Sequence, residues 1–557
     1  MSIDAPTFNL VNEPWIVVVD EKGREELRSL SNLSSDLHRF SRFGGEIALQ
    51  SFAILRLYLA ILHRSLADST TGLPGPADLS EWEHCVEDWD SVSFAIDKYL
   101  DRWRHRFDLL HPTEPFYQVA DLNTAKGAVG SLEAIIADVP TGHKYMTNRL
   151  GPSLEKISRA EAARWLVTVH AFDVSGIHSG ALGDPRVKAG KGYGIGTGWC
   201  GKLGGLHLNG RNLRETVLLN AVAFSEVDIE PRLDDLPTWE RPPLGAAVEA
   251  EDRQPRGPIE LYTWQSRRVR LVDDGRAIVG SLVCQGDPVD EANRMKIEPM
   301  TAWYYSKPQS DKRKMDIYRP KSHDPERAIW RGIEALLPAA KVARGGADVP
   351  RYLAPAVLEW AAYVARYGTD IVYDATCMLR AVGVQYGSQQ AVMDEMFDDE
   401  VVLPWKLLAE DSTPTLTSLV LAAVDATDSA VGSLGGLAVN LAEAGGLDPE
   451  MSAPLRDRTT AQAYGLLDIA FRSWLSGLTS VGEVATSRAA WRDTARTILM
   501  QAADAQIRQC APACWVGRNV RGSWLDAATA ERWFRTAINK ALPMDGVMEK
   551  GTEDGES

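Results

Sequence analysis

The sequence lacks an excess of positive charge. Its 557 residues include 60 Lys and Arg against 76 Asp and Glu, which gives a net charge of −16 at neutral pH. A chain with this balance does not coat nucleic acid or an anionic membrane through its overall electrostatic field. Any contact with nucleic acid therefore has to come from local basic patches, and we expect other subunits to share that task.

Cysteine is also scarce. Six cysteines are too few for a disulfide scaffold, and none forms the Cys-x-x-Cys pair of a zinc ribbon. Cys510 and Cys514 lie four residues apart, and two small buried residues are the favoured interpretation over a metal or redox pair. We therefore predict no metal site and no cofactor.

Long apolar runs are missing. The most apolar helix, predicted over residues 46–64, is interrupted by Gln50, Arg56 and His63, which is typical of a core helix and not of a membrane span. The first residues show neither the basic region nor the apolar stretch of a signal peptide. We expect a cytoplasmic protein with no membrane partner.

Catalytic motifs are absent as well. The chain contains no H-E-x-x-H, no G-x-S-x-G and no H-x-E with downstream cysteines. Adjacent carboxylates such as Asp234 and Asp235 do not converge on one helix face. His170 is expected to be a satisfied core residue on a helix. The sequence thus predicts no catalytic residue and argues against a hydrolytic enzyme.

The pattern of predicted helices and strands divides the chain into two parts. At about 100–200 residues per domain, the chain is long enough for at least two domains. The first part mixes short strands with helices, whereas helical periodicity marks four later segments: residues 414–444, 459–476, 484–509 and 526–541. The predicted fold class is α+β: a large mixed α/β domain over residues 1–400, an all-α four-helix bundle over residues 401–545 and a disordered acidic tail over residues 546–557.

Three local patterns in the first part predict particular elements. Residues 259–264, 269–272 and 277–283 predict a three-stranded meander with a hairpin turn at Asp274-Gly275. Residues 303–321 interleave aromatic and basic side chains, which suits either nucleic-acid contact or an exposed mixed-charge loop. A polar turn at Gln389-Gln390 precedes a predicted helix over residues 391–397.

The most unusual segment is residues 175–210, which carry twelve glycines. Gly196, Gly201 and Lys202 match most of a phosphate-binding P-loop, but Leu203 stands where a Ser or Thr must reach magnesium. A nucleotide-binding enzyme and a flexible surface loop are two interpretations. The third is a loop whose main chain closely approaches a polar surface such as a DNA groove, because glycine can turn its amides outward.

Five segments, in order along the chain, resemble one known family. They are FNLVNEPWI (residues 8–16), HPTEPFYQ (111–118), LRETVLLN (213–220), LPTWERP (236–242) and YTWQ (262–265). Together they resemble the large subunit, CasA, of the type I-E CRISPR Cascade complex. The resemblance implies a non-catalytic subunit of a crRNA-guided antiviral complex, which reads the protospacer-adjacent motif (PAM) from the minor groove and opens the duplex to start an R-loop.

The resemblance also implies partners: the other Cascade subunits, crRNA, double-stranded target DNA with its displaced strand, and a helicase–nuclease that the subunit helps recruit. A purely protein-binding assembly subunit is the alternative that stays open beside the nucleotide-binding enzyme.

Site residues follow from the same resemblance. The family's glycine loop matches Tyr193, Gly194, Ile195 and Gly196, and because the minor groove carries a degenerate code we expect tolerant PAM reading. The family's glutamine wedge matches Gln389 and Gln390. The family's minor-groove lysine has no motif match here, and Arg276 after the hairpin turn is the candidate. The loop that contacts the crRNA end and nearby DNA matches Lys144, Tyr145, Met146, Thr147 and Asn148, followed by Arg149.

Overall fold

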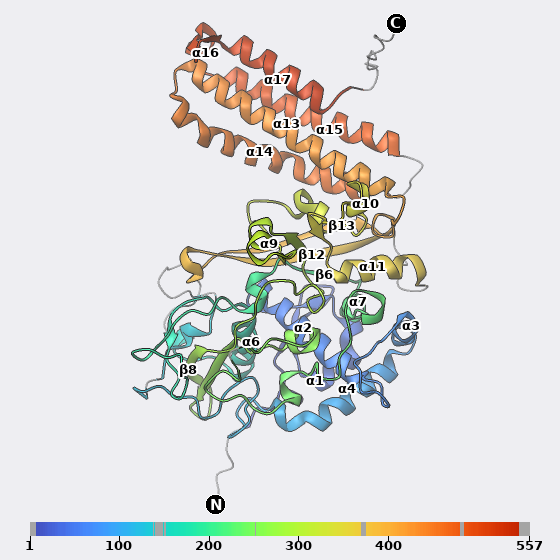
Figure 1. The fold of residues 1–557 in the computed structure, drawn as a ribbon, viewed down its shortest axis with the longest axis vertical. Coiled ribbons are helices and arrows are strands. Elements are labelled where there is room, and N and C mark those ends of the chain that lie inside the picture. Colours follow the sequence, from blue (N-terminus) through green and yellow to red (C-terminus); the bar gives the residue numbers. More distant parts are fainter. Residues whose placement is uncertain are drawn as a thin grey trace, which may run out of the picture. The chain divides into compact units, whose positions relative to one another are not determined.

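The computed structural model describes residues 7–127, 129–137, 139, 149, 152–250, 252–368, 375–478 and 484–544. The chain divides into two units (Figure 1). The first comprises Met1–Ile329 and Asp348–Val401, and the second comprises Trp330–Ala347 and Val402–Ser557. Strands and helices are mixed in the first unit and long helices dominate the second, so the predicted fold class is confirmed.

The first unit contains ten described helices and thirteen strands. The helices are α1 (Leu30–Asp36), α2 (Ala48–Ser65), α3 (Leu79–Glu87), α4 (Trp89–Trp103), α5 (Pro152–Glu155), α6 (Arg159–Phe172), α7 (Leu213–Asn220), α8 (Pro258–Tyr262), α9 (Lys307–Arg313) and α11 (Ala356–Tyr367). The strands are β1 (Ile16–Val19), β2 (Glu25–Arg28), β3 (Arg42–Phe43), β4 (His178–Ser179), β5 (Lys191–Gly192), β6 (Gly205–Asn209), β7 (Arg267–Asp273), β8 (Ile278–Gln285), β9 (Trp303–Tyr305), β10 (Tyr318–Pro320), β11 (Tyr352–Leu353), β12 (Thr376–Tyr386) and β13 (Met393–Pro404), which leads into the second unit.

Helix α2 lies in the core of the first unit. Nearly all of its side chains are buried, as expected of a helix that is apolar on every face. Arg56 in its middle donates two hydrogen bonds of 2.8 Å to Glu298, and neither side chain is exposed. His63 contacts the Gly75 carbonyl at 2.8 Å, and burial lowers its pKa to about 4, so the ring is neutral. Among the described residues, none of the helices combines sufficient length with sufficient hydrophobicity to span a lipid bilayer.

The strands form small sheets. The sheet with the longest strands has the order β13-β12-β6. Strands β12 and β13 form a hairpin whose tip is Gln389-Gln390. The predicted helix over residues 391–397 is therefore wrong, because Met393 onward pairs with β12. A segment this short takes the structure that its long-range partner imposes.

The predicted meander is a two-stranded hairpin. Strands β7 and β8 pair antiparallel around Asp274-Gly275, as expected. Its supposed first strand is helix α8, since Pro258 occupies the first turn and the Asp235 carboxylate accepts the amides of Ile259 and Glu260 at 3.1 and 2.7 Å. Periodicity cannot distinguish a short buried helix from a strand.

Residues 303–321 are a folded strand–helix–strand unit and not an open loop. Strands β9 and β10 pair with each other, and β9 also pairs with β11. The helix between them, α9, exposes Lys307, Lys312 and Arg313, and Arg313 lies 3.4 Å from the Asp290 carboxylate. The segment thus carries exposed basic side chains on an ordered framework.

The second unit is built on four long helices. Its described elements are α10 (Ala340–Ala343), α12 (Trp405–Leu408), α13 (Thr415–Gly445), α14 (Pro449–Ser476), α15 (Val484–Gln509), α16 (Pro512–Val516), α17 (Ala527–Ala541) and the hairpin β14 (Arg518–Val520) and β15 (Ser523–Leu525). Phe471 stacks on Trp330 at 4.1 Å and meets Trp491 edge-on at 4.9 Å. The Trp330 indole donates to Asp468 at 2.7 Å, so residues 330–347 complete a core that the sequence assigned to the later helices alone. The predicted tail at 546–557 lies outside the described residues.

Glu359 in α11 allows the effect of burial on stability to be tested as a function of pH. Burial and the nearby charge of Asp228 raise its pKa to about 7. The neutral form is therefore favoured in the fold, and the wild-type protein loses stability as pH rises from about 4.5 to 7. We expect Glu359→Gln to unfold at the same denaturant concentration as wild type near pH 4 and to be more stable by about 1–2 kcal/mol at pH 8. A stability difference between variant and wild type that is the same at pH 4 and pH 8 would contradict this assignment.

Candidate nucleic-acid interface

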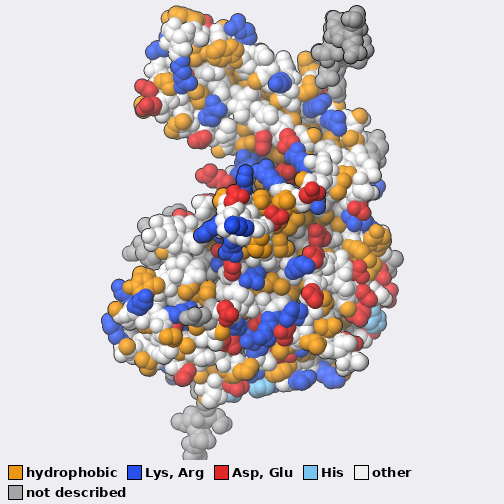
Figure 2. Space-filling view, viewed as in Figure 1, with side chains coloured by type: hydrophobic (Ala, Val, Ile, Leu, Met, Phe, Trp, Pro, Cys, Tyr) orange, Lys and Arg blue, Asp and Glu red, His pale blue; other side chains and the backbone are white. Residues whose placement is uncertain are grey.

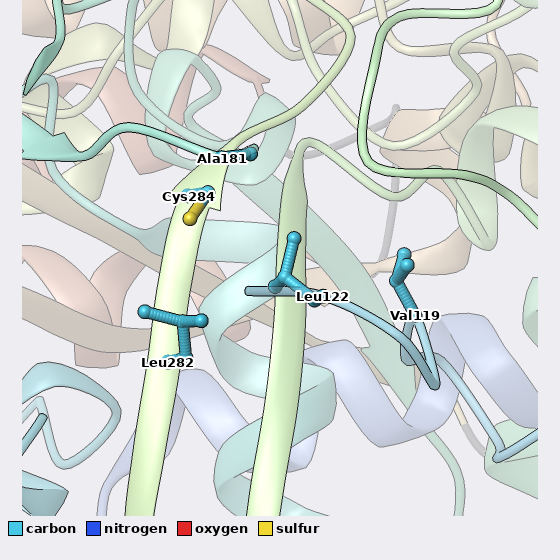
Figure 3. Packing of buried hydrophobic residues seen from close by; sticks show 5 residues of the cluster. All are labelled: Val119, Leu122, Ala181, Leu282 and Cys284. Carbon is cyan, nitrogen blue, oxygen red and sulfur yellow. The ribbon is translucent and has the colours of Figure 1, made fainter. Parts of the chain in front are cut away.

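The glycine-rich stretch is folded onto the first unit. Strands β4 and β5 pair through His178 with Gly192 and Ser179 with Lys191. Ala181 packs into a buried cluster with Leu282 and Cys284 of β8 and with Val119 and Leu122 (Figure 3). These contacts anchor the base of the stretch, so the loop that follows β5 starts from a fixed position.

The loop after β5 presents unpaired main-chain donors. Within the described part of the chain, the amides of Tyr193, Gly194 and Ile195 donate to no acceptor. The next amide, of Gly196, donates to the Ser175 hydroxyl at 3.1 Å, so it is engaged within the protein. The Tyr193 side chain is 52% exposed. Three consecutive amides are therefore available to an external acceptor.

Two glycines in this loop are required by its geometry. A Cβ atom at Gly194 would lie 2.6 Å from the Ser175 carbonyl oxygen and 2.9 Å from its hydroxyl. Gly196 has a φ of +100°, a conformation that other residues rarely adopt. Because these two glycines have no side chain, the loop can lie directly against the segment around Ser175.

A buried arginine lies behind the loop. Arg267 is fully buried and donates to the Asp173 carboxylate at 2.5 Å and to the carbonyls of Val174 and Gly196 at 2.7 and 2.9 Å. Burial alone would raise the pKa of Asp173, but the charges of Arg267 and His178 lower it to about 2. His178 Nε2 is 2.9 Å from the same carboxylate. The loop therefore lies against a cluster of charged and polar side chains with little exposure.

The Gln389-Gln390 tip lies beside the glycine loop. The Ser175 amide donates to the Gln390 carbonyl at 2.7 Å, while the Ser175 hydroxyl accepts from Gly196. Both glutamines are exposed and have left-handed φ values of 56° and 55°. Such values are uncommon for residues other than glycine and often mark functional positions. The fold thus brings together two predicted elements that are far apart in sequence.

Arg276 lies elsewhere. It is exposed at the β7–β8 turn, whereas Gln285 at the other end of β8 donates to the Gly176 carbonyl at 2.9 Å. At about 3.3 Å per residue, nine residues of extended chain separate these ends by about 30 Å. The structure does not place Arg276 at the glycine loop.

Two lysines that the sequence reasoning missed are close to the loop. Lys188 and Lys191 exchange main-chain hydrogen bonds of 3.1 and 3.0 Å in the turn that leads into β5, and both are exposed. The sequence feature that could have identified them is their position just before Tyr193. On the face shown in Figure 2, basic side chains gather in small groups among acidic ones.

The predicted crRNA-contacting loop is described only at its end. Lys144, Tyr145, Met146, Thr147 and Asn148 lie outside the described residues. Arg149 donates to Glu161 at 2.6 Å, and its guanidinium lies 5.6 Å from the centre of the Trp165 ring.

The P-loop interpretation does not have the required geometry. Lys202 is 10% exposed, donates to the Val289 carbonyl at 2.9 Å and lies 3.3 Å from the Glu291 carboxylate. The segment continues into strand β6 and not into a helix whose N-terminus can meet a phosphate. Among the described residues, no group of three or more His, Cys, Asp or Glu side chains is arranged to hold a metal ion.

Comparison with known proteins gives consistent matches. The family model of CRISPR-associated protein Cse1 matches residues 9–502. The CRISPR-associated protein CasA/Cse1 of Thermus thermophilus is 31% identical over 399 residues, which cover 70% of this chain and 69% of that protein. The crystal structure of Thermobifida fusca Cse1 matches with a TM-score of 0.87 and 40% identity, over 98% of this chain and 100% of that one. Cse1 from Acidimicrobium ferrooxidans matches with a TM-score of 0.79 and 28% identity, over 96% and 98%.

Proposed function

Since the chain belongs to the CRISPR-associated Cse1 family, we propose that it is the non-catalytic subunit through which a CRISPR RNA-guided surveillance complex recognises the PAM of double-stranded DNA. One observation carries the proposal: three unpaired amides of an exposed glycine loop lie beside an exposed glutamine pair. This arrangement offers donors and a wedge, and it needs no catalytic group.

The amides of Tyr193, Gly194 and Ile195 contact the minor groove in this proposal. Adenine N3 and thymine O2 are acceptors at equivalent places in that groove, so amide donors read its sequence only loosely. Lys188 and Lys191 supply phosphate contacts next to the loop, which position the duplex without reading its sequence. Tolerant PAM recognition follows from this division of roles.

Gln389 and Gln390 open the duplex in the second step. Both glutamines are exposed at the hairpin tip, and their amide side chains insert beneath the PAM in this proposal. Unstacking one base step costs about a few kcal/mol, which the PAM contacts have to offset. The order of events is therefore PAM contact first and strand separation second.

The remaining roles come from the family resemblance. Residues 144–148 contact the crRNA end and PAM-proximal DNA, the helical unit helps hold the displaced strand, and the subunit helps recruit the helicase–nuclease. Arg276 remains a candidate for a second DNA contact at a distance from the glycine loop.

The proposal is tested by omitting the subunit. The complete complex should bind a PAM-bearing duplex about 100-fold more tightly than a duplex with a scrambled PAM, and its affinity should fall with rising salt as phosphate contacts are screened. The complex without this subunit should bind both duplexes equally in filter binding. An unchanged preference would instead support a purely protein-binding assembly subunit.

A further inference from the structure

Arg267 holds the inner side of the glycine loop. Its guanidinium donates to four groups: the Asp173 carboxylate and the carbonyls of Ser266, Val174 and Gly196. The Gly196 carbonyl is thereby directed into the protein. The amide and the carbonyl of Gly196 are thus both engaged inside the protein, whereas the amides of the three preceding residues have no acceptor within the described part of the chain.

Ser175 is the point where the loop and the wedge meet. Its hydroxyl accepts from the Gly196 amide at 3.1 Å, and its own amide donates to the Gln390 carbonyl at 2.7 Å. The segment before it is fixed as well, since the Gly198 amide donates to the Asp173 carbonyl at 2.8 Å. A displacement of the loop is therefore transmitted to the hairpin tip through one residue.

We propose that Arg267 and Ser175 are positioning residues that join the PAM-contacting loop and the duplex wedge into one rigid element. Arg267 holds the Gly196 carbonyl of the loop and the Val174 carbonyl next to Ser175, and Ser175 fixes the loop to the wedge tip. This inference rests on the proposed function. It deepens that function, because PAM contact and duplex opening then depend on the same internal hydrogen bonds.

The chemistry of arginine is needed for this role. A guanidinium has five donors in a planar arrangement and can hold a carboxylate and several carbonyls at once, whereas lysine offers a compact charge. A lysine at position 267 would keep a cation for Asp173 but would not reach both the Val174 and the Gly196 carbonyls.

The chain provides a matched control next to Arg267. Arg268 is equally buried, pairs with Asp287 at 2.8 Å and donates to the carbonyls of Gly245 and Ala247 at 2.8 and 3.1 Å. None of these groups belongs to the glycine loop or the wedge. Replacement of either arginine by lysine removes a comparable set of buried contacts.

The first experiment compares Arg267→Lys with Arg268→Lys in the assembled complex. Both should lower the unfolding temperature, but only Arg267→Lys should reduce the ratio of affinities for PAM-bearing and scrambled duplexes, by about tenfold. Equal ratios for the two variants would overturn the role of Arg267.

The second experiment uses a mild change. Ser175→Ala should reduce both the affinity ratio and the opening of the first target base pair at saturating DNA, followed by 2-aminopurine fluorescence, by about fivefold each. Ser175→Thr keeps the hydroxyl and should retain both. Wild-type opening in the alanine variant would show that Ser175 does not join the two elements.

The outcomes separate this inference from the function on which it rests. If Gly194→Val abolishes PAM preference while Arg267→Lys and Ser175→Ala do not, the inference is wrong and the proposed function stands. If all three leave the preference unchanged, the glycine loop does not contact the PAM and both fail.

Discussion

Replacing Gln389 and Gln390 together with glycine in the assembled complex is expected to slow target-duplex opening by about 100-fold. Inserted side chains that stabilise the unstacked step by about 2.7 kcal/mol speed its opening by a factor of about 100, and glycine removes that stabilisation. Glycine is the informative replacement because it accepts the left-handed backbone of both positions while removing the side chains. The rate is measured by stopped-flow 2-aminopurine fluorescence at the first target base pair.

Two controls isolate the wedge. The double variant Gln389→Asn with Gln390→Asn keeps the amide groups and tolerates positive φ, so it should open DNA at close to the wild-type rate. A target with a preformed bubble next to the PAM needs no wedge, and the glycine variant should bind it as tightly as wild type does. Normal opening of intact duplex by the glycine variant would remove Gln389 and Gln390 from the mechanism.

Gly194→Val is expected to weaken binding to PAM-bearing duplex by about 100-fold. A Cβ atom at this position would lie 2.6 Å from the Ser175 carbonyl oxygen, so the loop has to move away from its support. Three amide hydrogen bonds to the groove, at about 1 kcal/mol each, account for a loss of this size. The measurement is the dissociation constant of the assembled complex for PAM-bearing and scrambled duplexes.

The matched control is Gly245→Ala. No atom lies within 4 Å of a Cβ placed at Gly245, so alanine is accommodated there without displacement. This variant should bind both duplexes as wild type does, and its unfolding temperature should be unchanged. If Gly194→Val also retained wild-type PAM preference, the glycine loop would not be the PAM-contacting element.

Structure prediction from the sequence succeeded where one segment contains all the information. The helical periodicity before residue 476 and after residue 484 matches α14 and α15, and the Asp274-Gly275 turn joins β7 and β8. Prediction failed where a residue far away in the sequence determines the local secondary structure. The Asp235 carboxylate turns an expected strand into α8, and pairing with β12 turns an expected helix into β13.

The candidate site shows the same division. The glycine loop and the glutamine pair were found through their resemblance to a family, each from a few consecutive residues. Their proximity, through Ser175, was not visible in the sequence, and neither was the burial of Arg267 against Asp173. The separation of Arg276 from the loop was also hidden, because it depends on which end of β8 faces the glycine stretch.

The sequence by itself determined that this chain is acidic, has two parts, contains a bundle of long helices and carries a glycine-rich segment. These properties depend on composition and on interactions between residues a few positions apart, so they can be deduced from short stretches of the sequence. Only the tertiary structure decided which amides stay unpaired and which buried cation supports them. Hydrogen-bond partners across about 70 to 200 residues depend on the packing of the whole unit, which no short pattern encodes.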